Sequence, residues 1–335
     1  RYGTLSAGLD RYMRWRTIDG ETILSEREGL ALNTLTVGLL NRAVLLDLLR
    51  WFVVFEDDGK GPIKKAAGYH QFHAVRKAMA SILSARDGDG KGGVIWHTQG
   101  SGKSLLMTFL AGRAMHLKEL ENPTVLVLTD RNDLDNQLYT TFGRCRDLLG
   151  EEPTQADSID DLKTLLNRQV GGIVFSTVQK FRPGRGENFP ELTDRSNVIV
   201  MVDEAHRTQY GFDAKMDQTT GEVRHGLAHH LRSALPNAVY VAFTGTPVEL
   251  VGANTRSVFG DYIDVYDIAQ AVEDGATVPI YYEGRVARVE IADDVRQSLD
   301  EEFDEATEAL EEDEVTATAK KWSQIEKLVG AGPRL

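Results

Sequence analysis

Short runs of apolar residues recur through the middle of the chain, and each run is followed by a stretch of polar residues. The runs occupy residues 93–96, 124–129, 172–176, 198–202 and 238–243. Because apolar side chains fill consecutive positions in each run, both faces of the segment must be buried, which is typical of strands inside a parallel sheet. The pattern predicts five buried strands.

Helical periodicity fills the intervals between these runs. Helices are expected at residues 66–85, 103–110, 133–142, 158–166, 222–234 and 266–273. Ser158, followed three residues later by Asp161, has the spacing of a capping box at a helix start. Strands that alternate with helices over about 200 residues predict an α/β fold with a doubly wound parallel sheet. Ligands of such sheets bind at the carboxyl ends of the strands.

The two ends of the chain have different patterns. Before residue 60, a helix is expected at 41–50 and a short strand at 51–55, and the turn residues of 57–62 indicate a boundary. After residue 278, strand character extends to 291, and apolar residues at helical spacing predict amphipathic helices at 299–310 and 320–329. We therefore expect a connector at 1–60, a central domain at 61–280 and an acidic helical connector at 281–335.

Charge and composition leave a wide choice of partners. The net charge is −13, but residues 293–314 hold twelve acids and one base, which leaves −2 on the rest of the chain. The acidic balance therefore does not exclude a nucleic-acid partner. A single cysteine, Cys145, excludes a disulfide framework, and no apolar run is long enough to span a bilayer, so we expect a cytoplasmic protein.

A glycine-rich turn follows the first apolar run. It reads His97-Thr98-Gln99-Gly100-Ser101-Gly102-Lys103-Ser104, and Leu105 begins the buried face of the next helix. A strand, a loop and a helix in this order form a phosphate-binding loop, in which backbone N–H groups surround phosphate oxygens. Lys103 would reach the β- and γ-phosphates and Ser104 would hold Mg²⁺. The generic motif has glycine where this chain has His97, and a plain turn after a buried strand is the alternative.

Acidic residues follow the fourth run as Asp203-Glu204-Ala205-His206. Asp203 would hold the Mg²⁺ of a nucleoside triphosphatase, usually through water. Glu204 would polarise the attacking water, because phosphoryl transfer depends on an oriented nucleophile and on charge neutralisation. His206 would couple the site to neighbouring elements. A solvated helix start is the alternative.

The fifth run ends in Thr244-Gly245-Thr246-Pro247, whose hydroxyls could bond the acidic motif and report the nucleotide state. Gln71 could read the edge of adenine through two hydrogen bonds. Two loops suit contacts with a nucleic-acid backbone, because hydroxyls, amides and basic side chains stand at helix starts there. These candidates are Thr129, Arg131, Thr177, Gln179 and Lys180. A Pro-terminated turn, a surface glutamine and ordinary helix caps are the alternatives.

The three motifs, in this order and spacing, resemble the first RecA-like motor domain of superfamily 2 helicases and translocases, a P-loop NTPase fold. Flanking stretches are similar to the motor and endonuclease (R) subunit of type I restriction enzymes. They are residues 15–21, 69–71, 128–135, 203–211 and 280–283.

This resemblance implies an ATP- and Mg²⁺-dependent enzyme that translocates double-stranded DNA before cleaving it. It also implies partner methyltransferase (M) and specificity (S) subunits. No Asp…Glu-x-Lys pattern occurs in residues 1–58, so we expect the nuclease domain before this chain and the second RecA-like domain after it. ATP lies between two such domains in this family, so we expect the chain to bind ATP and hydrolyse little of it alone.

Two other functions fit the same residues. Another superfamily 2 enzyme, such as an RNA helicase or a DNA-repair translocase, would have a similar motor core. A nucleotide-dependent scaffold would bind without hydrolysis, although Lys103, Ser104, Asp203 and Glu204 are all present. Dependence of ATP turnover on duplex DNA or on RNA distinguishes the restriction motor from another superfamily 2 enzyme, and lack of turnover under both conditions would support the scaffold.

Overall fold

The structure is a computed structural model that describes most of the chain. The described residues are 1–8, 11–25, 31–57, 61–130, 132–181, 189–205, 215–216, 223–224, 227–247, 249–250 and 253–279. The chain divides into two compact units, Arg1–Val278 and Pro279–Leu335. The expected helices at 299–310 and 320–329, and the expected strand from residue 280 onward, lie outside the described residues.

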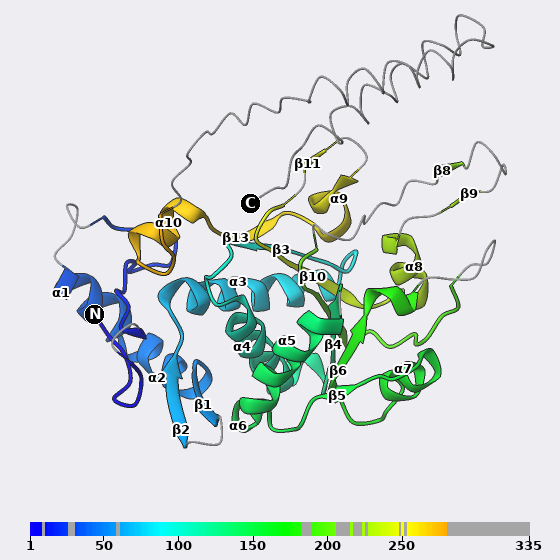
Figure 1. The fold of residues 1–335 in the computed structure, drawn as a ribbon, viewed down its shortest axis with the longest axis horizontal. Coiled ribbons are helices and arrows are strands. Elements are labelled where there is room, and N and C mark those ends of the chain that lie inside the picture. The colour runs from blue at the N-terminus through cyan, green and yellow to red at the C-terminus, as the bar shows by residue number, and fades with distance from the viewer. Residues whose placement is uncertain are drawn as a thin grey trace, which may run out of the picture. The chain divides into compact units, whose positions relative to one another are not determined.

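A seven-stranded sheet forms the centre of the first unit (Figure 1). Its order is β13 (Tyr262–Tyr266), β3 (Lys91–His97), β10 (Val239–Thr244), β7 (Val198–Val202), β4 (Thr124–Thr129), β6 (Gly172–Thr177) and β5 (Thr154–Gln155). Every neighbouring pair is parallel. The five predicted strands are therefore confirmed as β3, β4, β6, β7 and β10.

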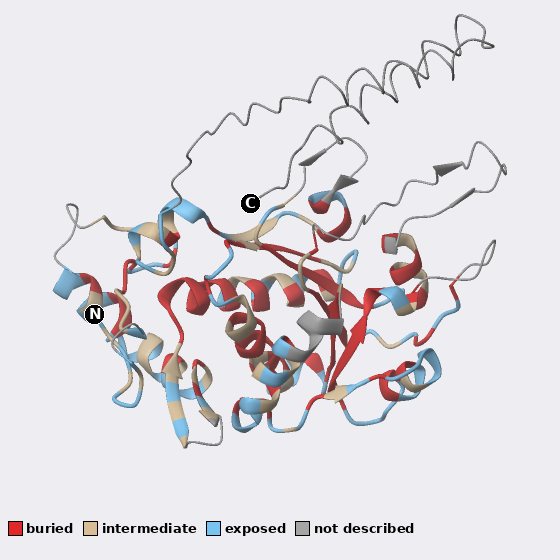
Figure 2. Ribbon diagram, in the orientation of Figure 1, coloured by how far each residue is buried: buried red, intermediate tan, exposed pale blue. Residues whose placement is uncertain are grey.

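Helices cover both faces of this sheet, as a doubly wound fold requires. Alternate residues of β4 show the division, because Val125 and Val127 belong to one buried cluster while Leu126 and Leu128 belong to the other. The first face packs on α3 (Tyr69–Arg86), α4 (Lys103–Met115), α5 (Asn132–Arg144) and α6 (Arg146–Leu149). The second face packs on α7 (Ile159–Leu166), α8 (Leu227–Ala234) and α9 (Thr255–Phe259). Figure 2 shows the sheet and the inner sides of α3 and α4 as buried.

The N-terminal region packs on the first face through aromatic rings. The N-terminal region extends from residue 1 to Ala66. Its helices and strands are α1 (Ala31–Thr34), a π-helical turn (Leu35–Leu39), α2 (Arg42–Trp51), β1 (Val53–Asp57) and β2 (Pro62–Ala66). Trp15 meets Phe72 of α3 edge-on, with ring centroids 5.4 Å apart, and Phe52 lies 4.6 Å from the same ring. The boundary indicated at 57–62 falls between β1 and β2, which pair antiparallel inside the first unit. The turn signal there joins two paired strands and does not separate compact units.

Several short elements depart from the sequence expectation. The helix expected at 222–234 begins only at Leu227, and Val223–Arg224 is instead strand β9, paired with β8 (Lys215–Met216). Strand β13 was not predicted, because polar Asp264 and half-exposed neighbours interrupt its apolar pattern. The helix expected at 266–273 begins only at Ile268, as α10 (Ile268–Glu273), because Tyr266 ends β13 and Asp267 caps the helix. The remaining elements are the 3₁₀ turns Lys118–Leu120 and Val178–Phe181 and the pair β11 (Glu249–Leu250) and β12 (Ala253–Asn254).

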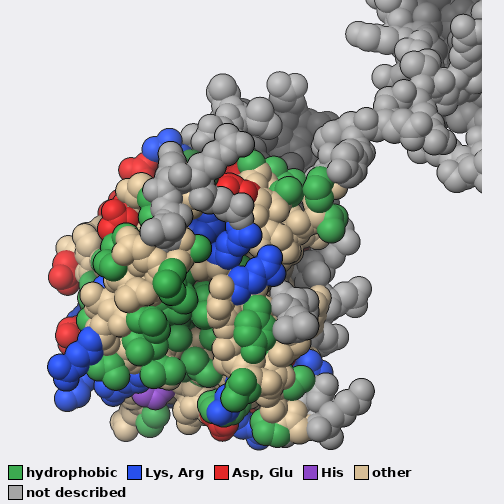
Figure 3. Space-filling model, turned by 90° about the vertical axis from the view of Figure 1, so that its left-hand side faces the viewer, with side chains coloured by type: hydrophobic (Ala, Val, Ile, Leu, Met, Phe, Trp, Pro, Cys, Tyr) green, Lys and Arg blue, Asp and Glu red, His purple; other side chains and the backbone are tan. Residues whose placement is uncertain are grey.

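Among the described residues, no single helix has the length and hydropathy to cross a membrane; only Ala31–Leu39 and Arg42–Trp51 taken together would, and they meet at a 73° bend. These two segments expose Leu32, Val37, Leu46 and Leu49, and Leu40 at the break between them is exposed as well. Figure 3 looks at the side of the molecule where the N-terminal region lies, and shows hydrophobic side chains gathered in the middle of that face, with basic side chains around them.

Candidate functional site

The glycine-rich loop joins the end of β3 to the first turn of α4. Gly100 and Gly102 both have a φ of 84°, a left-handed conformation that glycine adopts without the steric cost of a Cβ. Within the described part of the chain, the backbone N–H groups of Gly102, Lys103 and Ser104 donate no hydrogen bond. These donors stand at the amino end of a 13-residue helix, where the helix dipole also favours an anion. The loop therefore has the geometry of a phosphate site.

Lys103 lies at the centre of the three motifs. Its Nζ is 3.9 Å from the Oε1 of Glu204 and donates to the carbonyl oxygen of His97 at 3.3 Å. Gly245 lies beside the same ammonium group, because a Cβ added there would stand 3.4 Å from Nζ, in van der Waals contact. The three motifs, of which the first and last are at least 140 residues apart in sequence, thus meet at adjacent strand ends, as the sequence predicts.

The acidic motif follows β7 directly. The N–H of Asp203 continues the ladder to the carbonyl of Leu128, and its Oδ1 accepts the N–H of Glu204 at 2.9 Å. Glu204 has a φ of 46°, a strained conformation for a residue with a side chain, and Ala205 bonds back to Phe243 of β10. Such strain persists only where neighbouring contacts impose it, and here it directs Glu204 toward Lys103. His206 lies outside the described residues.

The turn after β10 lies between the other two motifs. Thr244 is fully buried, and its Oγ1 accepts the N–H of Thr246 at 3.1 Å. The carbonyl of Gly245 accepts the indole N–H of Trp96 at 3.1 Å, which ties this turn to β3. Since β10 pairs with both β3 and β7, a shift of this turn would also displace the glycine-rich loop after β3 and the acidic motif after β7.

Gln71 lies against the loop from the first turn of α3. Its Oε1 accepts the N–H of Gly68 at 2.9 Å, and its Nε2 donates to the carbonyl of Gly102 at 3.0 Å. The amide that could read adenine is therefore close to the phosphate loop and already bonded to it. A cavity of about 620 Å³ adjoins this contact. Its lining includes Gln71, Gly100, Ser101, Gly102 and Leu105, together with Tyr12 and Met13 of the N-terminal region.

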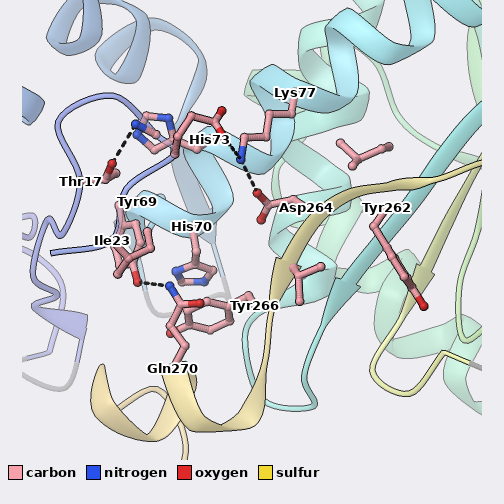
Figure 4. Close-up of a pocket in the computed structure, with 14 residues that line it drawn as sticks. Thr17, Ile23, Tyr69, His70, His73, Lys77, Tyr262, Asp264, Tyr266 and Gln270 are labelled. Atoms are coloured by element: carbon pink, nitrogen blue, oxygen red, sulfur yellow. Dashed lines mark hydrogen bonds and ion pairs between the residues drawn. The ribbon is translucent and has the colours of Figure 1, made fainter. Parts of the chain in front are cut away.

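His97, which replaces the usual glycine, is completely buried and faces away from the loop. Its Nε2 lies 2.9 Å from Oδ2 of Asp264 on β13, and Asp264 also pairs with Lys77 at 3.1 Å (Figure 4). Burial lowers the pKa of His97, so the neutral ring donates Nε2–H to the carboxylate. Burial alone would raise the pKa of Asp264, but the bond from His97 and the charge of Lys77 lower it. This departure from the generic motif thus anchors the loop entry to the sheet edge.

The remaining loop residues have ordinary positions. Thr98 and Ser101 are buried, Gln99 is exposed and Ser104 is half-buried in the first turn of α4. No group of three or more His, Cys, Asp or Glu side chains that could hold a metal ion occurs among the described residues. Magnesium in nucleotide sites takes few ligands from protein and completes its shell with phosphate and water. A site made of Ser104 and Asp203 fits that chemistry.

The backbone-contact candidates lie further along the same sheet edge. Thr129 and Thr177 are register partners on β4 and β6, both buried, and the Oγ1 of Thr129 has no hydrogen-bond partner among the described residues. Exposed Gln179 donates to the carbonyl of Asp130, which joins the two loops. Lys180 is half-buried, and Arg131 lies outside the described residues.

Sequence reasoning did not identify two further groups near the loop. His70 bonds the carbonyl of Ser101, and Arg16 pairs with Asp274 behind it. Arg16 stands in a basic-aromatic stretch whose plainest interpretation is an edge strand. The partner of His70 could not be predicted, because a histidine at a helix start gives no sequence signal of its contacts. The partner of Arg16 could not be predicted either, because Arg16 and Asp274 are 258 residues apart in the chain.

Comparison with known proteins agrees with this geometry. Residues 70–316 match the family model described as SWI2/SNF2 ATPase. The endonuclease subunit of the type I restriction enzyme HindI from Haemophilus influenzae is 45% identical over the whole of this chain. A protein assigned as the endonuclease subunit of MjaIXP from Methanocaldococcus jannaschii is 36% identical over 98% of the chain.

The chain spans 31% of the length of each of these two relatives. Among solved structures, the ATP-dependent Type ISP restriction-modification enzyme LlaBIII bound to DNA is similar to this chain. The match covers 64% of this chain and 16% of the LlaBIII chain, with 15% sequence identity and a TM-score of 0.43. The family model covers the glycine-rich loop, the acidic motif and the turn after β10 together. This chain therefore belongs to the SWI2/SNF2 ATPase family and is homologous to the endonuclease subunits of type I restriction enzymes.

Proposed function

We propose that this chain is the first motor domain of a type I restriction enzyme R subunit. It binds ATP with Mg²⁺ and couples hydrolysis to translocation of double-stranded DNA before cleavage. The observation that carries the proposal is the approach of Lys103 Nζ to Glu204 Oε1, 3.9 Å apart, beside a loop whose N–H groups are open to phosphate. Phosphoryl transfer uses a lysine that holds the phosphates and a residue that orients the nucleophile, and Lys103 and Glu204 stand where these two groups would act.

Each residue has a separate part in this mechanism. The N–H groups of Gly102, Lys103 and Ser104 hold phosphate oxygens, and Lys103 leaves Glu204 to neutralise the β- and γ-phosphates. Mg²⁺, held by Ser104 and Asp203, would supply charge neutralisation at the same oxygens. Glu204 then orients the attacking water. His206 and the turn Thr244–Thr246 transmit the state of the site along the sheet edge.

Translocation needs contacts that do not read sequence. Thr129 and Thr177 stand side by side at the ends of β4 and β6, and Gln179 joins their loops. We infer that these residues, with Arg131 and Lys180, hold the phosphate backbone of one DNA strand. The methyltransferase and specificity subunits would supply recognition, and the assembly would act on DNA in the cytoplasm.

The test is ATP turnover by the full-length parent protein, with and without unmodified duplex DNA and the two partner subunits. Turnover that requires both DNA and partners supports a restriction motor. Turnover stimulated by RNA, or by any DNA without partners, would instead support another superfamily 2 enzyme. Absence of turnover under every condition, with ATP still bound, would support a nucleotide-dependent scaffold.

A further inference from the structure

Two consecutive side chains of α3 bond two consecutive carbonyl groups of the phosphate loop. The Nε2 of His70 lies 3.1 Å from the carbonyl oxygen of Ser101, and the Nε2 of Gln71 lies 3.0 Å from that of Gly102. Both side chains come from the first turn of the helix, and both are more than nine-tenths buried. The loop is therefore held from its outer side.

A bond to a carbonyl also fixes the N–H of the same peptide unit. The peptide group is planar and trans, so its C=O and N–H point in opposite directions. When His70 holds the Ser101 carbonyl outward, the N–H of Gly102 must point to the inner side of the loop. Gln71 acts in the same way on the N–H of Lys103. Glycine at 102 would otherwise let this peptide turn easily, since glycine resists rotation least.

His70 is itself held by a network that reaches the N-terminal region. Its ring stacks on Tyr266 at 4.1 Å with 8° between the planes (Figure 4). The hydroxyl of Tyr266 donates to Asp274 at 2.8 Å, and Tyr69 donates to the same carboxylate at 2.7 Å. Arg16 completes the network by pairing with Asp274 at 2.8 Å.

The tautomer of His70 follows from its surroundings. Nε2 faces a carbonyl oxygen, which accepts only, so Nε2 must carry the proton. Burial, with a smaller contribution from His97, lowers the pKa of His70 to about 4, so the ring is neutral at physiological pH. The proton on Nε2 is therefore present throughout the physiological range.

We propose that His70 is a positioning residue for nucleotide binding, which aims the Gly102 N–H at phosphate and connects the loop to Arg16 through Tyr266 and Asp274. The proposal rests on the function proposed above. It also gives the N-terminal region a direct influence on the phosphate loop, because the chain of contacts from Arg16 to Ser101 is continuous.

The test measures the affinity of the 335-residue chain for ADP and for AMP, each with Mg²⁺, in three variants. His70→Phe keeps a ring that can stack on Tyr266 but removes the donor. His70→Gln restores a donor at a similar reach. His73→Phe is the matched control, because this buried histidine lies one turn along α3 and bonds no part of the phosphate loop. Thermal unfolding without nucleotide is measured for each.

We expect His70→Phe to weaken ADP binding roughly fivefold to tenfold, the effect of one lost hydrogen bond. His70→Gln should recover most of that loss, and AMP should lose less affinity than ADP. His73→Phe should leave ADP affinity within about twofold even if it lowers the unfolding temperature. If His70→Phe does not fold, Tyr266→Leu, which removes the stacking partner, should give a smaller loss of the same kind.

Equal ADP affinity in the wild type, His70→Phe and His70→Gln would overturn the positioning role while leaving the proposed function intact. A loss that His73→Phe reproduces would also overturn it, since it would then reflect stability alone. Failure of the wild type to bind ADP would instead overturn the proposed function.

Discussion

Lys103 and Glu204 lie 101 residues apart in sequence, yet their charged atoms approach to 3.9 Å at the ends of two strands. Their side chains are 12% and 20% exposed, so solvent screens the pair only in part. Gly245 lies next to the ammonium group, and the backbone of Glu204 is held in a strained conformation with a φ of 46°. At the scale of single residues, the proposed function requires a phosphate to displace Glu204 from Lys103.

Lys103→Ala and Glu204→Gln should separate binding from turnover. We expect Lys103→Ala to weaken ATP binding by roughly 10- to 100-fold, because a charge-assisted contact to phosphate is lost. Glu204→Gln should retain binding but reduce turnover in the parent protein by about 100-fold or more, because the carboxylate that orients water is lost. Nucleotide affinity and steady-state hydrolysis are the measurements. Lys118→Ala, on the exposed 3₁₀ turn, is the control, and unchanged turnover in Glu204→Gln would refute its role.

The buried histidines of α3 predict loss of stability in acid. Burial lowers the pKa of both His70 and His73 to about 4, from 6.5 in the unfolded chain. Between these values the unfolded state binds more protons, so the free energy of unfolding falls as the pH falls from 6.5 toward 4. The slope is about 1.4 kcal/mol per pH unit for each ring. Denaturant midpoints at pH 7, 6 and 5 measure how the free energy of unfolding changes with pH. His73→Phe should make this pH dependence shallower. A free energy of unfolding that does not change between pH 7 and 5 would contradict both pKa shifts.

At the scale of elements, α3 connects the N-terminal region to the nucleotide loop. Its first turn bonds the loop through His70 and packs on Trp15 and Phe52 through Phe72, and Lys77 further along reaches β13. Arg16 then joins the N-terminal region to the residues that follow α10. These contacts explain why residues 1–278 form a single compact unit.

Arg16→Ala should destabilise this unit by about 3 kcal/mol, because removing one partner of a buried pair leaves an uncompensated charge. The two side chains are only 9% and 3% exposed. Arg86→Ala is the matched control, since its partner Glu121 is 72% exposed and such a pair is worth about 1 kcal/mol or less. Chemical denaturation measures both variants, and equal losses would show that Arg16 has no special part.

At the scale of the whole molecule, the chain spans 31% of the length of its HindI and MjaIXP relatives. Residues 70–316 match the ATPase family model, so the site described here lies within the matched range. The activity of the whole restriction enzyme is a proposal for the parent protein, and the chain itself supplies the loop, the acidic motif and the turn between them.

The 335-residue chain should bind ATP yet hydrolyse it at least about 100-fold more slowly than the parent with DNA and partners, because transition-state charge is stabilised by groups from more than one domain. Nucleotide binding and steady-state turnover of both proteins are measured side by side. Turnover by the chain at the parent's rate would contradict the proposal that a second domain completes the site.

The sequence by itself determined the five buried strands, the order of the motifs and the sheet edge at which the motifs meet. Continuous apolar runs are possible only where both faces of a strand are covered, and parallel strands place their carboxyl ends at one edge. The glycines of the loop and the acids after β7 are local signals of this kind. Strand β13 escaped prediction because its pattern is mixed, and β5 because it has only two residues.

Only the tertiary structure decided which distant side chains meet. His97 bonds Asp264, His70 bonds Ser101, and Arg16 bonds Asp274, over separations of 167, 31 and 258 residues. No local pattern encodes such pairs, because each depends on where the packed sheet places two strand or helix ends. The strain at Glu204 and the bonded state of Gln71 likewise exist only once β3, β7 and β10 and the amino end of α3 have come together.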